Sequence, residues 1–383
     1  MVLQRFLIIT LFIFKLTYTH SQISDFKEKF ELPNEVKETS GLLFLDGKII
    51  SHNDSGGSPN LYEIDSLSGN IIRTISISNA TNIDWEDLAE NDTHIFIADI
   101  GNNNGNRQNL KIYKILKSDF KNNNTVSAEI ISFSYEDQTD FSSQPNSSNF
   151  DAEGIVIYGN NLLIFTKNWS DYKTNVYKIP LATGNYVAVK ISSANIQGLI
   201  TSAVYIQDRF FLTGYNTSLI PFLIYISSNR IPGEDIFFSG FNKISLESEL
   251  GQGSQIEAIT NIGVTGKYYI SREYFTTTVA GTAFTFKQKL YQFYDDTNAL
   301  LSIHKNELDF LKISPNPVID KINIQINVSF SNIDIYNSLG EKVFRPKFHH
   351  LKEIDISSLS AGIYYLKVQL EDASSVVRKI IKL

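Results

Sequence analysis

The sequence contains no cysteine among its 383 residues, and it has only one methionine and two tryptophans. Without cysteine the chain cannot form a disulfide framework, a thiolate zinc site, an iron–sulfur cluster or a cysteine nucleophile. Basic residues are also scarce, because 34 Lys and Arg stand against 41 Asp and Glu, which gives a formal net charge of −7. This balance makes nucleic acid an unfavourable partner.

Several catalytic motifs are missing as well. The chain has no Gly-x-Ser-x-Gly elbow, no phosphate-binding P-loop, no His-Glu-x-x-His pair and no dinucleotide-binding fingerprint. Serine-hydrolase and NAD-dependent chemistry are therefore disfavoured. The chain does contain 19 tyrosines and 26 phenylalanines against 21 glycines and nine prolines, a composition typical of packed globular protein.

The first 21 residues have the pattern of a signal peptide. Arg5 precedes a short apolar run over residues 6–14, and a polar stretch ends at Ser21. The run is too short for a hydrocarbon layer that needs about 20 helical residues, so a cleaved signal is favoured over a permanent anchor. No later stretch is long and apolar enough to predict a transmembrane anchor.

The last part of the chain, residues 311–383 after a linker at 301–310, has a different pattern. Short alternating runs such as 321–326 and 333–336 are separated by Pro and Gly, which predicts a small antiparallel β-sandwich. Four phrases, Ile313-Ser-Pro-Asn-Pro, Ile335-Tyr-Asn-Ser-Leu-Gly-Glu-Lys-Val, Asp355-Ile-Ser-Ser-Leu-Ser-Ala-Gly-Ile-Tyr-Tyr-Leu and a basic terminus, resemble the C-terminal sorting domain of type IX secretion. The resemblance implies that the type IX machinery exports the protein to the outer cell surface or beyond. A generic accessory sandwich is the alternative.

Residues 22–300 are strand-rich and contain a recurring phrase. A Ser or Glu followed by small and apolar residues opens a strand, a tight turn and a second strand, at intervals of about 50 residues, as in propeller blades. The phrases begin at Ser40, Glu86, Glu153, Ser202 and Glu257. Only three strands follow the last phrase, so we expect a strand at residues 27–32 to complete the fifth blade and close the ring. The sequence thus predicts an all-β protein with a five-bladed β-propeller, although six blades are not excluded.

In a propeller the innermost strands surround one axis, so the five opening residues are expected to meet there. Three glutamates in such a ring repel one another, and either proton uptake or a bound cation offsets the repulsion. The ligands offered are all oxygen, which favours a hard ion, and calcium accepts six to eight oxygens in loose geometry. We therefore predict a calcium site formed by Ser40, Glu86, Glu153, Ser202 and Glu257. The alternative is that the glutamates are solvated or bonded to backbone amides.

The order Ser, Glu, Glu, Ser, Glu, with phrases such as Thr39-Ser-Gly-Leu, Trp85-Glu-Asp-Leu-Ala and Ile256-Glu-Ala-Ile, resembles the calcium-activated nucleotidases, or soluble apyrases. The resemblance covers only the blade anchors. It implies a five-bladed propeller with a central calcium ion at these positions, and calcium-dependent hydrolysis of phosphoanhydrides or phosphoesters.

The second strand of each blade is expected to end beside the ring, which brings further side chains to the same mouth. Asp54 and Asp99 are candidates to position or deprotonate a water, and Lys167 and Arg272 to hold phosphate or carboxylate. Asp and Asn are also common in turns for backbone reasons, so a purely structural role is the alternative. The predicted function is accordingly a secreted or cell-surface calcium-binding propeller for an undefined small molecule or surface polymer. An apyrase-like hydrolase is the alternative.

Overall fold

The computed structural model describes residues 23–227, 235–238, 240–263, 266–279, 282–295, 311–326, 330–338, 340–346, 353–370 and 375–383. The chain divides into two compact units, Met1–Asp296 and Thr297–Leu383. The expected signal peptide (residues 1–21) and linker (301–310) lie outside the described residues. The helices of the described parts are short: α1 (Lys117–Asn122), α2 (Glu247–Leu250) and the 3-10 turn η1 (Asn34–Val36). None of them is long and apolar enough to cross a membrane. The expected all-β class is confirmed.

In the first unit, successive segments of the chain form sheets in which strands that are neighbours in sequence mostly lie side by side. The first sheet contains β2 (Thr39–Leu45), β3 (Lys48–Asn53), β4 (Asn60–Asp65), β5 (Ile71–Ile77) and the short β9 (Thr125–Val126). The next group contains β6 (Trp85–Glu90), β7 (His94–Asp99), β8 (Lys111–Leu116) and β10 (Glu129–Tyr135). It is followed by β11 (Ala152–Tyr158), β12 (Asn161–Thr166), β13 (Thr174–Pro180) and β14 (Gly184–Ala194). Parallel pairing of β10 with β14 joins these two groups into one eight-stranded sheet.

Two further sheets complete this part of the unit. One contains β15 (Leu199–Ile206), β16 (Arg209–Tyr215), β17 (Pro221–Ser227) and β18 (Asn242–Ser245). The other contains β19 (Ile256–Asn261), β20 (Lys267–Arg272), β23 (Lys289–Asp295) and, at its edge, the N-terminal β1 (Ile23–Glu31). β1 pairs antiparallel with β23, so the N-terminal strand completes the last sheet, as predicted. This pairing covers an edge that would otherwise expose free backbone groups.

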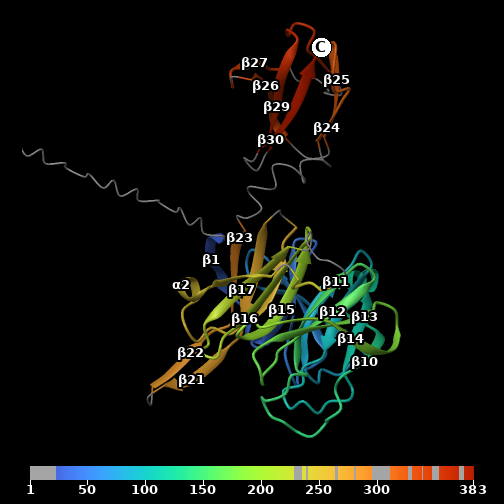
Figure 1. Cartoon of the computed structure of the whole chain (residues 1–383), viewed down its shortest axis with the longest axis vertical. Coiled ribbons are helices and arrows are strands. Elements are labelled where there is room, and N and C mark those ends of the chain that lie inside the picture. The colour runs from blue at the N-terminus through green and yellow to red at the C-terminus, as the bar shows by residue number, and fades with distance from the viewer. Residues whose placement is uncertain are drawn as a thin grey trace, which may run out of the picture. The chain divides into compact units, whose positions relative to one another are not determined.

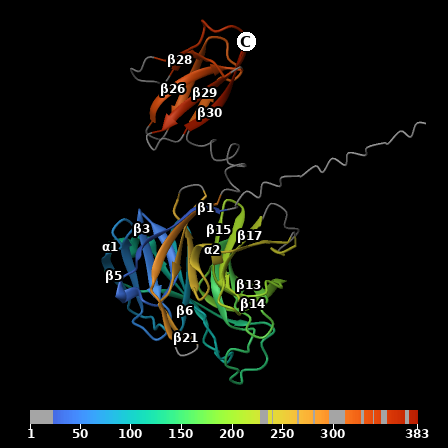
Figure 2. The same cartoon turned by 90° about the vertical axis from the view of Figure 1, so that its left-hand side faces the viewer.

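The five strands that open these groups lie around a common centre. β2 contacts β6, β6 contacts β11, β11 contacts β15, β15 contacts β19, and β19 contacts β2 again. Apolar clusters fill the spaces between successive groups, and one of them packs Leu42 and Ile64 of the first sheet against Tyr269 and Leu290 of the last. Figure 2 shows β3 and β5 on the opposite side of the unit from β13 and β14. The arrangement is propeller-like, with β2, β6, β11, β15 and β19 as the inner strands.

Burial along the strands follows their place in this arrangement. The first five residues of β11 are all buried, whereas exposure alternates along much of β14. Inner strands are covered on both faces by neighbouring groups, and outer strands are partly exposed to water, which accounts for the difference. A separate hairpin of β21 (Phe275–Val279) and β22 (Thr282–Phe286) projects from the body of the unit (Figure 1).

The second unit is a small β-sandwich, as predicted. One sheet has the order β24 (Leu311–Ser314), β25 (Lys321–Ile326), β28 (Glu353–Asp355). The other has the order β27 (Lys342–Phe344), β26 (Phe330–Asn337), β29 (Gly362–Leu370), β30 (Ser375–Lys382). Ile322 and Ile324 of the first sheet belong to one buried cluster with Ile335 and Leu366 of the second. The alternating runs read from the sequence therefore supply the two inner faces of this sandwich.

Candidate functional site

A polar cavity of about 180 Å³ lies where the inner strands begin. It contains four of the five predicted metal ligands and two of the four predicted catalytic residues. Its lining residues are Ser40, Asp54, Glu86, Asn103, Asn146, Glu153, Lys167, Trp169, Tyr215, Gln255, Glu257 and Glu273. We call it the acidic cavity, because five of these side chains carry carboxyl groups and only Lys167 carries an ammonium group.

A β-bulge near the start of each inner strand positions these residues. The pairing register shifts by one residue between Ala152 and Gly154 of β11, for example, so Glu153 has no partner on β12. The same shift places Glu257 opposite no residue of β20, and similar shifts occur at Ser40 of β2 and Glu86 of β6. Bulges re-aim side chains and are frequent beside functional sites. Here they turn residues of separate sheets toward one centre.

The fourth inner strand corrects one predicted ligand. In β15 the bulge falls between Ile200 and Ser202, so the residue equivalent to Glu153 is Thr201 and not Ser202. The Thr201 hydroxyl donates a hydrogen bond to the Ile256 carbonyl at 2.5 Å and is fully buried. The structure places Ser202 outside the acidic cavity, because a slip of one residue along a strand moves a side chain to the other face. The spacing to the following turn could have identified Thr201 as the equivalent residue. Thr201 precedes Gln207 by the same number of residues as Glu153 precedes Gly159.

Ser202 instead belongs to a buried hydrogen-bond group around Asp87, a residue that the sequence analysis missed. Ser202 Oγ donates to Asp87 Oδ1 at 3.0 Å. Asp87 Oδ2 accepts from the amides of Ile155 on β11 and Ala203 on β15, at 3.0 and 3.2 Å. Burial raises the pKa of Asp87 to about 8, although these hydrogen bonds oppose the rise. Asp87 thus crosslinks three inner strands in the interior of the ring.

Asp99 and Arg272, the other two predicted catalytic residues, do not line the acidic cavity. Asp99 lies opposite Trp85 in the register, and Arg272 lies opposite Ile256. Directly opposed residues share one face of a sheet. The side chains of Asp99 and Arg272 therefore lie on the same face as the buried Trp85 and Ile256, and not on the face of the neighbouring glutamates. In three of the five groups the residue that follows the second strand lines the cavity instead. Asp54, Lys167 and Glu273 hold this position.

Both side chains have local partners. Asp99 Oδ1 forms an ion pair with Arg107 at 2.7 Å, and it accepts the backbone amide of Asp84. The Arg272 guanidinium donates to the Lys287 carbonyl at 3.0 Å and to Ser254 Oγ at 3.2 Å. These contacts assign both residues to the support of loops beside the cavity.

Three carboxyl groups converge at one side of the acidic cavity. Oxygen atoms of Asp54, Asp84 and Glu86 lie within 4.8 Å of one another. Asp54 Oδ1 is buried and has no hydrogen-bond partner among the described residues. Gly101 makes this approach possible, because a Cβ atom at residue 101 would collide with Glu86 Oε1 and with the Asp84 carboxyl group. We call these three residues the carboxylate cluster.

Burial and mutual repulsion raise the pKa values of these groups. Burial is the largest cause for Glu86, and the charges of Asp54 and Glu153 add to it, so its pKa lies well above the ordinary value. The pKa of Asp84 rises to about 6, through burial first and the charge of Asp151 second. Burial also raises the pKa of Glu273 to about 7. The protein without a cation therefore favours protons in this cavity.

A lysine also lines the cavity. Lys167 Nζ lies 2.5 Å from Glu153 Oε1, and both side chains are almost fully buried. The ammonium group also lies 5.2 Å from the ring centre of Trp169 and 5.3 Å from that of Tyr215. Burial lowers the pKa of Lys167, but the charges around it, Glu153 foremost, outweigh burial and raise the pKa well above its ordinary value. Lys167 is thus a charged internal counter-ion for Glu153.

The donor atoms of the carboxylate cluster fit a hard divalent cation. The described lining offers carboxylate, amide and hydroxyl oxygens and no histidine, a donor set that suits calcium or magnesium better than zinc or copper. The unpartnered Asp54 oxygen and the room left by Gly101 add to this fit. The cluster lies beside Ser40, whose hydroxyl donates to the Glu86 carbonyl at 2.6 Å.

Comparison with known protein families identifies the second unit. Residues 312–383 match the family of secretion system C-terminal sorting domains. The match confirms the predicted type IX sorting domain and implies an interaction with the type IX secretion machinery. It also indicates export to the outer cell surface or the extracellular space. No curated protein matches the chain at a significant level.

Solved structures are similar to this chain at low sequence identity. A Thermus thermophilus protein, named as an oxidoreductase (glucose dehydrogenase), has 9% identity and a TM-score of 0.38, over 71% of this chain and 99% of that chain. The extracellular domain of a one-component system protein from B. thetaiotaomicron has 11% identity and a TM-score of 0.29, over 90% and 43%. Hydrazine synthase from Kuenenia stuttgartiensis has 7% identity and a TM-score of 0.35, over 89% and 76%. The comparisons do not support the expected resemblance to calcium-activated nucleotidases.

Proposed function

We propose that the first unit is a five-bladed β-propeller that binds calcium in its acidic cavity and acts as a ligand-binding protein outside the cell. The observation that carries this proposal is the carboxylate cluster, whose oxygens lie within 4.8 Å of one another and two of whose members, Asp54 and Glu86, line the acidic cavity. The blade count is supported by the cyclic contacts of the five inner strands and by the bulge that each of them contains.

The electrostatic argument favours a cation in this cavity. Two unit charges 4.8 Å apart repel by about 3 kcal/mol at an effective dielectric constant near 20. Lys167 offsets only part of this repulsion, because its ammonium group is paired with Glu153. Proton uptake is one way to relieve the remaining repulsion, and a divalent cation on the carboxylate cluster is the other.

Calcium fits the cluster better than magnesium does. Magnesium demands near-ideal octahedral geometry and gives up its water reluctantly, whereas calcium accepts carboxylates in mixed geometry. The carboxyl groups come from two chain segments, the loop after β3 at Asp54 and the segment at the start of β6 that contains Asp84 and Glu86, and such a set imposes no regular octahedron. In this proposal Asp54, Asp84 and Glu86 hold the ion, and waters and the nearby Ser40 complete its oxygen shell.

The hydrolase alternative remains a prediction. Asp54 and Lys167 line the cavity, as that mechanism requires, but Asp99 and Arg272 do not. When the five lining carboxyl groups and Asp84 are ionised, one calcium ion and Lys167 together leave three negative charges unbalanced. A phosphate substrate would meet this excess negative charge, which opposes its binding. A neutral or cationic ligand is therefore favoured.

The proposal is tested by calorimetric calcium titration of the whole chain, with thermal unfolding measured in EDTA and in calcium. We expect saturable binding and a melting temperature that rises with calcium, because binding to the native state alone stabilises it. Glu86→Gln should abolish both effects, whereas Glu247→Gln, an exposed change in α2, should leave them intact. Calcium binding that is equal in the two variants, or absent from the parent protein, would reject the site.

A further inference from the structure

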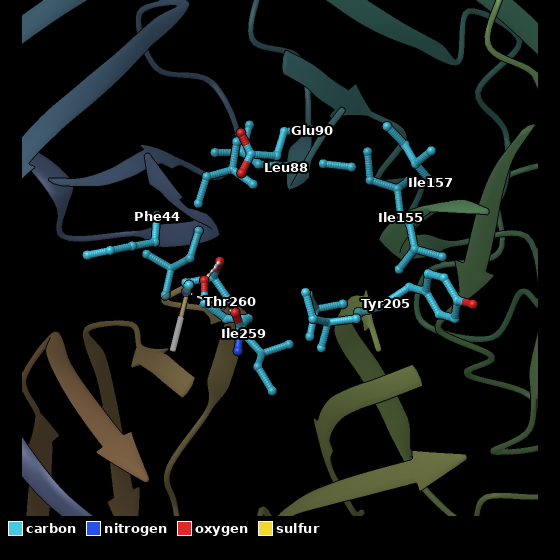
Figure 3. Close-up of a pocket in the computed structure, with 17 residues that line it drawn as sticks. Phe44, Leu88, Glu90, Ile155, Ile157, Tyr205, Ile259 and Thr260 are labelled. Carbon is cyan, nitrogen blue, oxygen red and sulfur yellow. Dashed lines mark hydrogen bonds between the residues drawn. The ribbon is translucent and has the colours of Figure 1, made fainter. Parts of the chain in front are cut away.

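A second cavity, of about 290 Å³, lies at the opposite end of the ring of inner strands. Along β2, Ser40 lines the acidic cavity and Leu42 lines this one. Figure 3 shows Leu88, Ile155 and Ile259 around an open centre. We call this space the apolar cavity, because most of its lining consists of aliphatic and aromatic residues of the five inner strands.

A layer of small residues and one carboxylate separates the two cavities. The residues that follow the bulge positions on β11 and β15 are Gly154 and Ser202, and Asp87 holds the same place on β6. A Cβ atom at residue 154 would lie 3.3 Å from the Ala203 side chain, so this layer is closely packed. Asp87 reaches past β11 to the Ala203 amide on β15. The apolar cavity and the acidic cavity have no lining residue in common.

The apolar cavity has no unbalanced charge among its described lining residues. Glu90 is the one charged residue there, and its carboxylate pairs with Lys117 Nζ at 2.6 Å. Asn261 is also engaged, since its amide group donates to the Lys267 carbonyl and accepts the Gly263 amide. Because aliphatic and aromatic side chains form most of this lining, replacement of water inside the cavity by an apolar molecule is favourable.

We propose that the apolar cavity is a binding site for a small neutral apolar molecule, either an aliphatic chain or a single aromatic ring. The size agrees with such a ligand, because an apolar cavity of about 150 Å³ accommodates benzene and ligand pockets begin at about 300 Å³. Anionic and cationic molecules are excluded by the absence of a free counter-charge in the described lining. The site is independent of the calcium proposal, since the two cavities have no lining residue in common.

The test uses the whole chain and the neutral fluorophore N-phenyl-1-naphthylamine. Its emission should rise saturably on binding, equally in calcium and in EDTA, and decane should displace it. Ala203→Leu enlarges a side chain that lines the cavity, and it should therefore weaken binding at least tenfold. Ala182→Leu adds the same atoms at an exposed position and should change nothing. Equal binding in the two variants would overturn the proposal, as would the absence of any saturable signal in the parent protein.

A second measurement keeps the proposal testable if Ala203→Leu does not fold. Phe44→Trp places an indole at the rim of the apolar cavity. A brominated alkane should quench this added emission saturably, whereas the parent protein, whose tryptophans are Trp85 and Trp169, should show no saturable quenching. Quenching that is linear in alkane concentration in both proteins would mean collision from solvent and would overturn the site.

Discussion

Lys167 Nζ lies 2.5 Å from Glu153 Oε1 inside the acidic cavity. The protein therefore places a positive charge of its own beside a glutamate that was predicted to bind calcium. Glu153 therefore has a direct ion pair, whereas Asp54, Asp84 and Glu86 have none among the described residues, although the charge of Lys167 also acts on Asp54 and Asp84. Calcium is therefore expected at Asp54, Asp84 and Glu86, and Glu153 is better described as a partner of lysine than as a ligand.

Replacement of Lys167 by Met should have opposite effects on metal binding and on metal-free stability. Loss of the ammonium group leaves Glu153 as an uncompensated buried charge, which destabilises the metal-free protein by about 3 to 5 kcal/mol. The same loss raises the negative potential of the cavity, so calcium affinity should increase about tenfold or more. Calorimetry and urea unfolding in EDTA measure the two effects. Lys167→Arg keeps the charge and serves as the control. A weaker calcium affinity in Lys167→Met would contradict this assignment.

Gly101→Ala should disrupt the carboxylate cluster by steric means alone. The added methyl group would meet Glu86 Oε1 and the Asp84 carboxyl group, so one of them has to move. We expect calcium affinity to fall about tenfold or more and stability to fall by about 1 to 3 kcal/mol. Gly57→Ala is the matched control, because its Cβ atom would have only Asn82 nearby, at 3.8 Å. Unchanged calcium binding in Gly101→Ala would separate the cluster from the metal.

The raised pKa values of the cavity carboxyl groups predict how stability depends on pH. A carboxyl group whose folded pKa lies above its unfolded pKa binds more protons in the folded state, so stability falls as pH rises between the two values. With folded pKa values of about 6 for Asp84 and about 7 for Glu273, the melting temperature in EDTA should fall from about pH 4.5 to pH 7. Saturating calcium should remove most of this fall, because it stabilises the ionised groups. Glu273→Gln should flatten the EDTA profile. A profile that rises over this range would show that the pKa values are not raised.

The local pattern of strands could be predicted from the sequence because it depends on neighbouring residues. The phrase at Ser40 predicted a strand, a tight turn and a second strand, and the structure has β2 and β3 there. The closing strand was also predictable, since three strands after Glu257 left one place in the last sheet. Alternating hydrophobicity and tight turns contain this information.

The direction of individual side chains was harder to predict, because it depends on bulges and on strand register. Because the bulge in β15 falls at Thr201, the position equivalent to Glu153 is Thr201 and not the predicted Ser202. Arg272 and Glu273 are likewise neighbours in sequence with different surroundings. Arg272 lies opposite Ile256 in the register, whereas Glu273 lines the cavity. Asp87 was missed for a related reason, since its partners on β11 and β15 are distant in sequence and no local pattern indicates them.

Asp87→Asn should test whether the interior of the ring depends on this carboxylate for stability. Three donors outside its own strand converge on Asp87, namely the amides of Ile155 and Ala203 and the Ser202 hydroxyl. An asparagine has one oxygen and one donor group there, so at least one buried amide would lose its acceptor, and we expect a loss of about 2 to 4 kcal/mol in the free energy of unfolding. Urea unfolding measures the loss. Asp140→Asn, in an exposed loop, should change stability by less than about 0.5 kcal/mol. Ser202→Ala removes one donor only, and it should therefore have a smaller effect than Asp87→Asn. If Asp87→Asn and Ser202→Ala were equally mild, the crosslink between inner strands would not contribute to stability, and packing between the sheets alone would stabilise the ring.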